Sequence, residues 1–198
     1  HCDSRRQRQM CIRDSFETAE EFIGPLSESI RPHLTEDTHL LFSYHGLPVS
    51  HVKRIDRSKA HCQTVEACCT VKCEANSLCY GRHCNETTMA VVERLGLKPD
   101  QWSLSYQSRL GPVKWLEPST TQMVEALVKK GVKKLAIVAP AFLADGLETL
   151  EELDIGIREE FMEHGGTELK VINCLNDDEQ WVRGLEQLIA KEFEQAVA

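Results

Sequence analysis

The alternation of apolar and polar residues predicts helices and strands in turn from residue 16 onward. Apolar positions at helical spacing indicate a helix over 16–34, which Pro25 is expected to kink or break. Short apolar runs that end at glycine, proline or charged residues indicate strands. The strands are expected over 39–44, 102–106, 135–139 and 169–172, and further helices over 85–95, 120–130, 147–163 and 179–193, with a charged loop over 50–60. This order is typical of an α/β fold in which helices cover the faces of a four-stranded parallel sheet.

Polar side chains follow the end of each predicted strand. His45 follows the first strand, and Ser108 and Arg109 follow the second. Glu148 comes soon after the third strand, and Asn176 follows the fourth. Because the carboxyl ends of parallel strands meet at one edge of the sheet, where ligands bind, we expect a single active site there.

The histidine and the acidic helix are the candidates for acid–base and metal chemistry. Gly46 and Pro48 turn the backbone directly after His45. A histidine in this position can bind a metal or accept a proton near neutral pH, and packing against a turn is an equal alternative from this segment alone. Glu148 and Glu152 lie four residues apart on one helix face, where they could hold a divalent ion and take up protons. Acidic residues in a first helical turn also occur as surface groups stabilised by the helix dipole.

The loop over 108–118 contains two prolines, a glycine and a tryptophan, a composition that favours a rigid loop. Arg109 could pair with a carboxylate or phosphate group of a ligand. Trp115 could pack on a flat ring system, although a tryptophan on a loop is more often part of the core.

The composition excludes some classes of function. A formal net charge of −8 argues against nucleic acid as the main partner, because phosphate binding needs a basic face. No apolar run approaches the roughly 20 residues that are needed to span a bilayer, so the sequence predicts no transmembrane helix. A peripheral contact with a membrane stays open. Residues 1–15 are locally basic and show no helical or strand period, so we expect a foreign leader, with a native disordered arm as the alternative.

Six of the nine cysteines fall between residues 62 and 84. Nothing in the opening residues resembles a secretion signal, so a disulfide framework has no support. Cys69, Cys73, Cys79 and Cys84 have spacings compatible with a structural zinc site, and free thiols in a reducing compartment are the alternative.

Three motifs together resemble those of ferrochelatases. They are Ser-Tyr-His-Gly-Leu-Pro at 43–48, Ser-Arg-Leu-Gly-Pro at 108–112 with Trp-Leu-Glu-Pro at 115–118, and Phe-Leu-Ala-Asp-Gly-Leu-Glu at 142–148. The resemblance covers 16–198 and implies the C-terminal one of two Rossmann-like, chelatase-like halves, with the N-terminal half missing. It implies a lyase of the last step of haem biosynthesis, which inserts Fe(II) into protoporphyrin IX. This half alone is expected to be inactive.

The resemblance also assigns roles to individual residues. His45 matches the active-site histidine that accepts pyrrole protons or passes the metal, and Glu148 matches the glutamate opposite it. Glu152 continues an acidic track for the iron. Tyr44 and Leu47 are expected to flank the macrocycle, with Ser108, Arg109 and Trp115 as further substrate-binding residues. Gly146 departs from relatives that carry a second histidine there.

Some bacterial ferrochelatases carry a cysteine-rich insertion at 62–84 that binds a 2Fe-2S cluster. By this resemblance the expected ligands are Cys62, Cys69, Cys79 and Cys84, with Cys68 as the substitute for Cys69, and the cluster is structural or regulatory. The resemblance implies a cytoplasmic protein, with contact at the inner membrane left open. The alternatives are a cobalt or nickel chelatase of tetrapyrroles and a non-catalytic iron–sulfur or zinc-binding domain.

Overall fold

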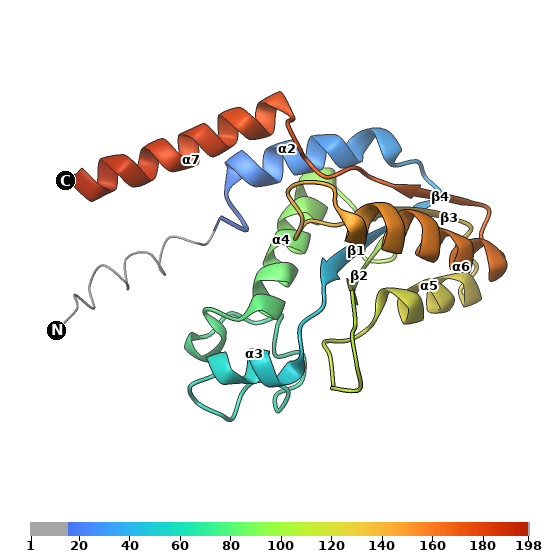
Figure 1. Ribbon diagram of the computed structural model, residues 1–198, viewed down its shortest axis with the longest axis horizontal. Coiled ribbons are helices and arrows are strands. Elements are labelled where there is room, and N and C mark those ends of the chain that lie inside the picture. Colours follow the sequence, from blue (N-terminus) through green and yellow to red (C-terminus); the bar gives the residue numbers. More distant parts are fainter. Residues whose placement is uncertain (1–15, 198) are drawn as a thin grey trace.

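A four-stranded parallel sheet forms the centre of the chain (Figure 1). The computed structural model describes residues 16–197, so the predicted foreign leader at 1–15 lies outside the described residues. The strands are β1 (Thr38–His45), β2 (Trp102–Gln107), β3 (Lys134–Val138) and β4 (Glu168–Val171), in the spatial order β2-β1-β3-β4. All three neighbouring pairs are parallel, which confirms the predicted α/β class and sheet.

Helices cover both faces of this sheet (Figure 1). They are α2 (Glu20–Ile30), α3 (Val49–Ile55), α4 (Tyr80–Leu95), α5 (Thr120–Lys129), η3 (Glu148–Ile157), α6 (Arg158–Glu163) and α7 (Glu179–Val197), with short 3₁₀ turns η1 (Arg31–His33) and η2 (Glu74–Asn76). Within the described part of the chain, no helix has both the length and the apolar character needed to cross a membrane.

The strands divide the core into two layers because successive side chains of a strand point to opposite faces. Leu40, Phe42 and Tyr44 of β1 pack with α2, α4 and α7. Leu41, between them, packs on the other face with α5, η3 and α6. His45 is four residues after Leu41 on the same strand, so its side chain points to the same face of the sheet as Leu41, the face covered by α5 and η3.

Helix α2 continues through Pro25 without a break, against the expected interruption. Proline has no N–H, so the carbonyl of Glu21 one turn earlier loses its helical partner. Gly184 of α7 lies against this carbonyl, and a Cβ at that position would lie 2.4 Å from the oxygen. The missing side chain therefore lets α7 approach α2 closely, and the two helices run side by side (Figure 1).

Three predicted boundaries were wrong for local reasons. The expected charged loop at 50–60 contains helix α3, which buries Val49 and Val52 while its basic residues stay exposed. Helix α4 begins five residues earlier than expected, at Tyr80, because Cys79 occupies the N-cap position. The long helix predicted at 147–163 begins as the wider π-helix η3 before it becomes α6.

Candidate active site and cysteine segment

His45 stands at the carboxyl end of β1, half-buried, with one ring nitrogen open for chemistry. Its Nδ1 lies 2.7 Å from the carbonyl oxygen of Gly46. A carbonyl only accepts, so Nδ1 carries the proton and Nε2 keeps its lone pair. The ring of Phe142, from the loop after β3, lies 6.0 Å away between centroids. The side chain is thus oriented as a base or a metal ligand at the predicted sheet edge.

Gly46 is required by close packing behind this histidine. Its N–H donates to the carbonyl of Gln107 at 2.8 Å. A Cβ at position 46 would lie 2.6 Å from that same oxygen and 3.4 Å from Cε3 of Trp115. Any larger residue would displace the backbone that carries His45.

Gln107 connects the histidine strand to the acidic helix, and the sequence analysis missed it. It pairs in register with His45, accepts a hydrogen bond from Ser43 Oγ at 2.7 Å, and is buried. Its Nε2 donates to the carbonyl oxygen of Glu148 at 3.0 Å. This bond fixes the first turn of η3 beside the end of β1. The only signal in the sequence is its place as the last polar residue of a buried strand.

Glu148 and Glu152 occupy different environments. The Glu148 side chain is half-buried, and a Cβ at Gly146 would lie 3.3 Å from its Oε2. Glu152 accepts two hydrogen bonds of 2.6 Å from Ser108, one from its N–H and one from its hydroxyl. Ser108 has a φ of +61°, the left-handed region that is unfavourable for a residue with a Cβ. Glu152 therefore anchors the loop after β2, a role that its spacing did not indicate.

The loop over 108–118 folds back on itself. Arg109 donates to the carbonyl of Leu116 at 3.0 Å and lies 4.0 Å from Glu117. Trp115 pairs its backbone with Pro48 and is half-buried, and its indole Nε1 has no hydrogen-bond partner among residues 16–197. Leu47, whose carbonyl accepts from Leu116, is half-buried beside the loop. Substrate contacts for Arg109, Trp115 and Leu47 stay predictions.

Tyr44 does not share this site. Its side chain is 3% exposed and lies in the α2, α4 and α7 core, where its hydroxyl bonds Thr88 Oγ1 at 2.9 Å. Neighbouring strand residues point to opposite faces, so Tyr44 and His45 cannot both face one ligand. The expected contact between Tyr44 and a macrocycle is corrected to a packing role.

A carboxylate network joins the ends of β3 and β4. Asp145 accepts hydrogen bonds from the side-chain amide of Asn176 at 2.7 Å, the N–H of Cys174 at 3.1 Å and the hydroxyl of Thr149 at 3.1 Å. Burial opposes ionisation of Asp145, but these bonds outweigh it and lower the pKa of the carboxyl. Burial and the neighbouring Asp145 raise the pKa of the Cys174 thiol to about 12, so Cys174 is an unreactive part of this network.

The cysteine segment begins at a turn centred on Asp56. The carboxylate of this residue accepts hydrogen bonds from the N–H groups of Ser58, His61 and Cys62 at 2.8–2.9 Å and from the Ser58 hydroxyl at 2.6 Å. These bonds hold the pKa of Asp56 well below its usual range. The segment over 56–62 is therefore ordered by one ionised carboxylate, which presents Cys62.

Four thiols gather where this segment meets the start of α4. Sγ of Cys68 lies 3.8 Å from Sγ of Cys69. The absence of a side chain at Gly81 leaves room for the Cys69 sulfur, because a Cβ at position 81 would lie only 3.0 Å from that sulfur. A hydrogen bond from Cys69 and the N–H groups at the start of α4 lower the pKa of Cys79. Burial, Cys68 and Cys79 raise the pKa of Cys62 to about 11. Cys62, Cys68, Cys69 and Cys79 thus influence one another electrostatically.

Cys84 lies deeper than these four. It is 3% exposed, burial raises the pKa of its thiol, and the nearby Tyr80 hydroxyl opposes this shift. The Tyr80 hydroxyl also donates to the carbonyl oxygen of His45 at 2.8 Å. A single tyrosine therefore bridges the helix that carries Cys79 and Cys84 to the backbone of the candidate catalytic histidine.

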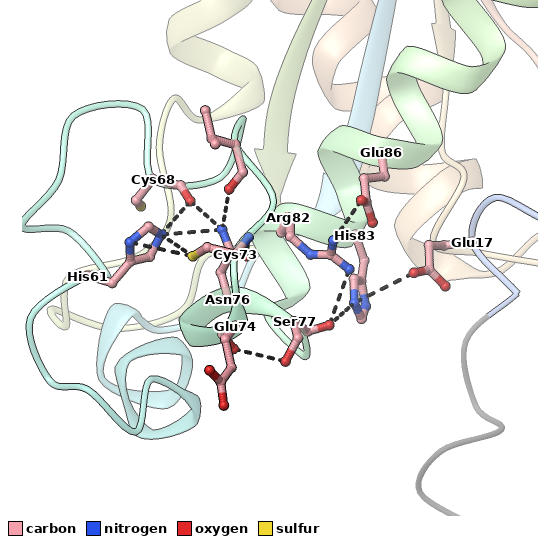
Figure 2. A network of polar contacts seen from close by, with 11 residues as sticks. Glu17, His61, Cys68, Cys73, Glu74, Asn76, Ser77, Arg82, His83 and Glu86 are labelled. Carbon is pink, nitrogen blue, oxygen red and sulfur yellow. Dashed lines mark hydrogen bonds and ion pairs between the residues drawn. The ribbon is translucent and has the colours of Figure 1, made fainter.

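The side chain of Cys73 lies against the imidazole of His61 (Figure 2). Its sulfur lies 3.7–3.8 Å from the two ring nitrogens of His61, and its N–H donates to Asn76 Oδ1 at 2.9 Å. Asn76 in turn donates to the carbonyls of Cys68 and Val71. Cys73 belongs to the zinc set that the spacing allows and lies outside the cluster ligands that the resemblance implies, and its ligation stays a prediction.

A zinc ion and a two-iron cluster each need four thiolates, in different arrangements. Tetrahedral zinc with Zn–S bonds of about 2.3 Å needs every sulfur pair to be about 3.8 Å apart. Among residues 16–197, no three cysteine sulfurs come within 4.8 Å of one another. A 2Fe-2S cluster divides four thiolates into pairs on two irons, which allows close and distant sulfurs together.

Comparisons with known proteins identify relatives over nearly the whole chain. The ferrochelatase family model matches residues 2–193, which includes most of the predicted leader. A ferrochelatase of Pseudomonas syringae pv. syringae is 42% identical over 181 residues, covering 91% of this chain and 53% of that protein. One of Pseudomonas aeruginosa strain LESB58 is 44% identical over 168 residues, covering 84% and 49%. The chain therefore spans about half the length of the curated relatives it matches.

Among solved structures, a putative cobalamin biosynthesis CbiX protein of Marinobacter aquaeolei aligns with 80% of this chain and 98% of its own. The TM-score is 0.47 and the sequence identity is 17%.

Proposed function

Because this chain belongs to the ferrochelatase family, we propose that it is the C-terminal half of an enzyme that inserts Fe(II) into protoporphyrin IX. The observation that carries the proposal is the edge formed by His45, with Nε2 open, and the first turn of η3, which Gln107 fixes beside it. The relatives are about twice as long, so the porphyrin would lie between this edge and a preceding half.

Metal insertion requires that two pyrrole protons leave as the iron enters the ring. In the proposed reaction Nε2 of His45, whose lone pair points away from the Gly46 carbonyl, accepts the two protons one after the other and passes the first to solvent before it takes the second. The Glu148 carboxylate supplies an oxygen ligand that Fe(II) can leave. Glu152 acts mainly through Ser108, by holding the loop that carries Arg109 and Trp115 against the edge.

The test is haem formation by this chain fused to the N-terminal half of the Pseudomonas syringae relative. His45→Ala is expected to lower the rate by roughly 100-fold or more, as for removal of a general base. His51→Ala is the matched control, because His51 is an exposed histidine on α3. An active fusion whose His45→Ala variant turns over like the parent would remove the histidine from the reaction.

For the cysteine segment we propose a 2Fe-2S cluster held by Cys62, Cys69, Cys79 and Cys84, with Cys68 as the competing fourth ligand. The mutual electrostatic influence of Cys62, Cys68, Cys69 and Cys79 supports a site here. Cys68 was expected as the substitute for Cys69, and the burial of Cys84 makes Cys68 a competitor of Cys84 instead. Insertion of iron into the porphyrin transfers no electrons, so we expect a structural role for the cluster. When bound, it would cross-link the cysteine segment to α4.

Anaerobic purification with an absorption spectrum and metal analysis tests this proposal. About two irons per chain with charge-transfer bands are expected, and one zinc without colour would replace the cluster by a zinc site. Single Cys→Ser variants then identify the fourth ligand. Loss of iron in Cys68→Ser but not in Cys84→Ser assigns Cys68, and the opposite result assigns Cys84.

We further propose that the protein acts in the cytoplasm, with peripheral contact at the inner membrane through the loop over 108–118. Leu110 and Val113 on this loop are 82% and 54% exposed. Co-sedimentation with lipid vesicles tests the contact, which Leu110→Ser with Val113→Ser should weaken.

A further inference from the structure

A second group of metal-binding side chains lies where the segment before α2 meets the start of α4 (Figure 2). Glu17, His83 and Glu86 each place one donor atom within 4.8 Å of the other two. His83 and Glu86 are three residues apart on α4, so they share a helix face. Glu17 is held beside them because its carbonyl accepts the hydroxyl of Thr87 at 3.0 Å. We propose that these three side chains bind a divalent transition-metal ion.

The donor set suits such an ion. One imidazole and two carboxylates favour Fe(II), Mn(II) or Zn(II) over Mg(II), which keeps most of its water ligands. His83 Nε2 lies 3.0 Å from the carbonyl oxygen of Ser77 and 3.6 Å from Glu17 Oε1, so Nε2 is the ring nitrogen that faces the carboxylate, and it would bind the ion when the ring proton sits on Nδ1.

The local charge favours a cation but limits its affinity. The charged groups are the carboxylates of Glu17 and Glu86 and the guanidinium of Arg82, which lies 2.6 Å from Glu86 Oε1. The imidazole of His83 is neutral when it binds a metal. Glu17, Glu86 and Arg82 together contribute one net negative charge to the site. Glu86 keeps its second oxygen for the ion. The side chains of Glu17, His83 and Glu86 are 18%, 23% and 27% exposed, so an ion can enter from solvent.

An ion at this site would act on the cysteine segment. The Ser77 carbonyl accepts both His83 and Arg82, and Ser77 precedes Cys79 by two residues. Because Nε2 cannot donate to Ser77 while it binds an ion, metal binding would leave Arg82 as the donor to this carbonyl and so change the contacts of the loop that presents Cys79. The ion would also cross-link the segment at Glu17 to α4. Binding energy at the site would add to the stability of this corner of the protein by mass action.

Mn(II) is the probe, because it prefers oxygen and imidazole ligands to the nearby thiolates. Electron paramagnetic resonance of the cluster-loaded chain counts bound Mn(II), including any at the His45 edge. His83→Ala is expected to bind one ion fewer than the parent. The matched control is His164→Ala, because His164 faces Glu125 at 3.8 Å without a third ligand, and it should keep every ion.

The variant Glu17→Gln separates loss of the ion from a folding defect in His83→Ala. It replaces one carboxylate oxygen of the site and leaves the contacts of Ser77 with Arg82 and His83 intact. It should weaken the same Mn(II) ion by roughly tenfold or more while the circular dichroism spectrum stays unchanged. Equal Mn(II) counts in the parent and His83→Ala, or loss of the ion in His45→Ala instead, would overturn the assignment. The result is independent of whether the chain supports haem formation.

Discussion

Replacing Glu152 with alanine removes both acceptors that hold Ser108 in its left-handed conformation. A hydrogen bond to a charged group contributes about 1.5–3 kcal/mol, and the half-exposed position of Glu152 places each of these near the lower limit. Relaxation of the Ser108 backbone returns about 1–2 kcal/mol. We therefore expect Glu152→Ala to lower the free energy of unfolding by about 1–2 kcal/mol.

Urea unfolding of the chain measures this loss directly, with Glu151→Ala as the control. Glu151 is the exposed neighbour on the same helix, and its removal should change stability by no more than about 0.5 kcal/mol. In the fusion, loss of the anchor should raise KM for porphyrin, because the displaced loop carries Trp115. Unchanged stability together with a raised KM for Fe(II) alone would refute the anchor role and restore Glu152 to a metal track.

Three further substitutions test other parts of the structure. Gly46→Ala should lower haem formation in the fusion at least tenfold, because its Cβ would lie 2.6 Å from the Gln107 carbonyl, whereas Gly156→Ala, with its nearest atom at 3.8 Å, should be neutral. The lowered pKa of Asp145 contributes stability that is fully present above the ordinary carboxyl pKa of 3.8 and is lost as the pH falls through the lowered pKa. In Asp145→Asn, the midpoint of urea unfolding should therefore depend less on pH in the acidic range. The same pH dependence in the variant and the parent would contradict the network. Asp56→Ala should free the turn before Cys62 and at least halve the iron retained per chain, whereas full iron content would show that the turn is dispensable.

The sheet and its active edge were predictable because they depend on local periodicity. Apolar runs such as 39–44 and 135–139 bury both faces of a strand, and parallel strands bring their carboxyl ends together. Helix α3 was missed because only Val49 and Val52 of it are buried, so its charged residues gave no periodic apolar signal.

The partners of side chains at the site could not be predicted in the same way. Tyr44 was placed beside the ligand because it neighbours His45, although strand parity turns it into the opposite core. Glu152 was assigned from its helical spacing, whereas its partner Ser108 lies 44 residues away. Long-range hydrogen bonds of this kind leave no pattern in one sequence.

The bond from the Tyr80 hydroxyl to the His45 carbonyl connects the start of α4 to the candidate catalytic histidine, so in the proposed enzyme we expect damage at the cysteine segment to reach the histidine through its backbone. Peroxide attacks accessible thiolates, and Cys79, directly before Tyr80, has a lowered pKa but is 6% exposed, so we expect peroxide to reach it only after the cluster is lost and the segment opens. A shift of this first turn of α4 would move the phenol and, through it, the peptide that orients the imidazole. Peroxide should therefore inactivate the parent fusion before any histidine is modified. Tyr80→Phe, which starts from a lower rate, should lose little more.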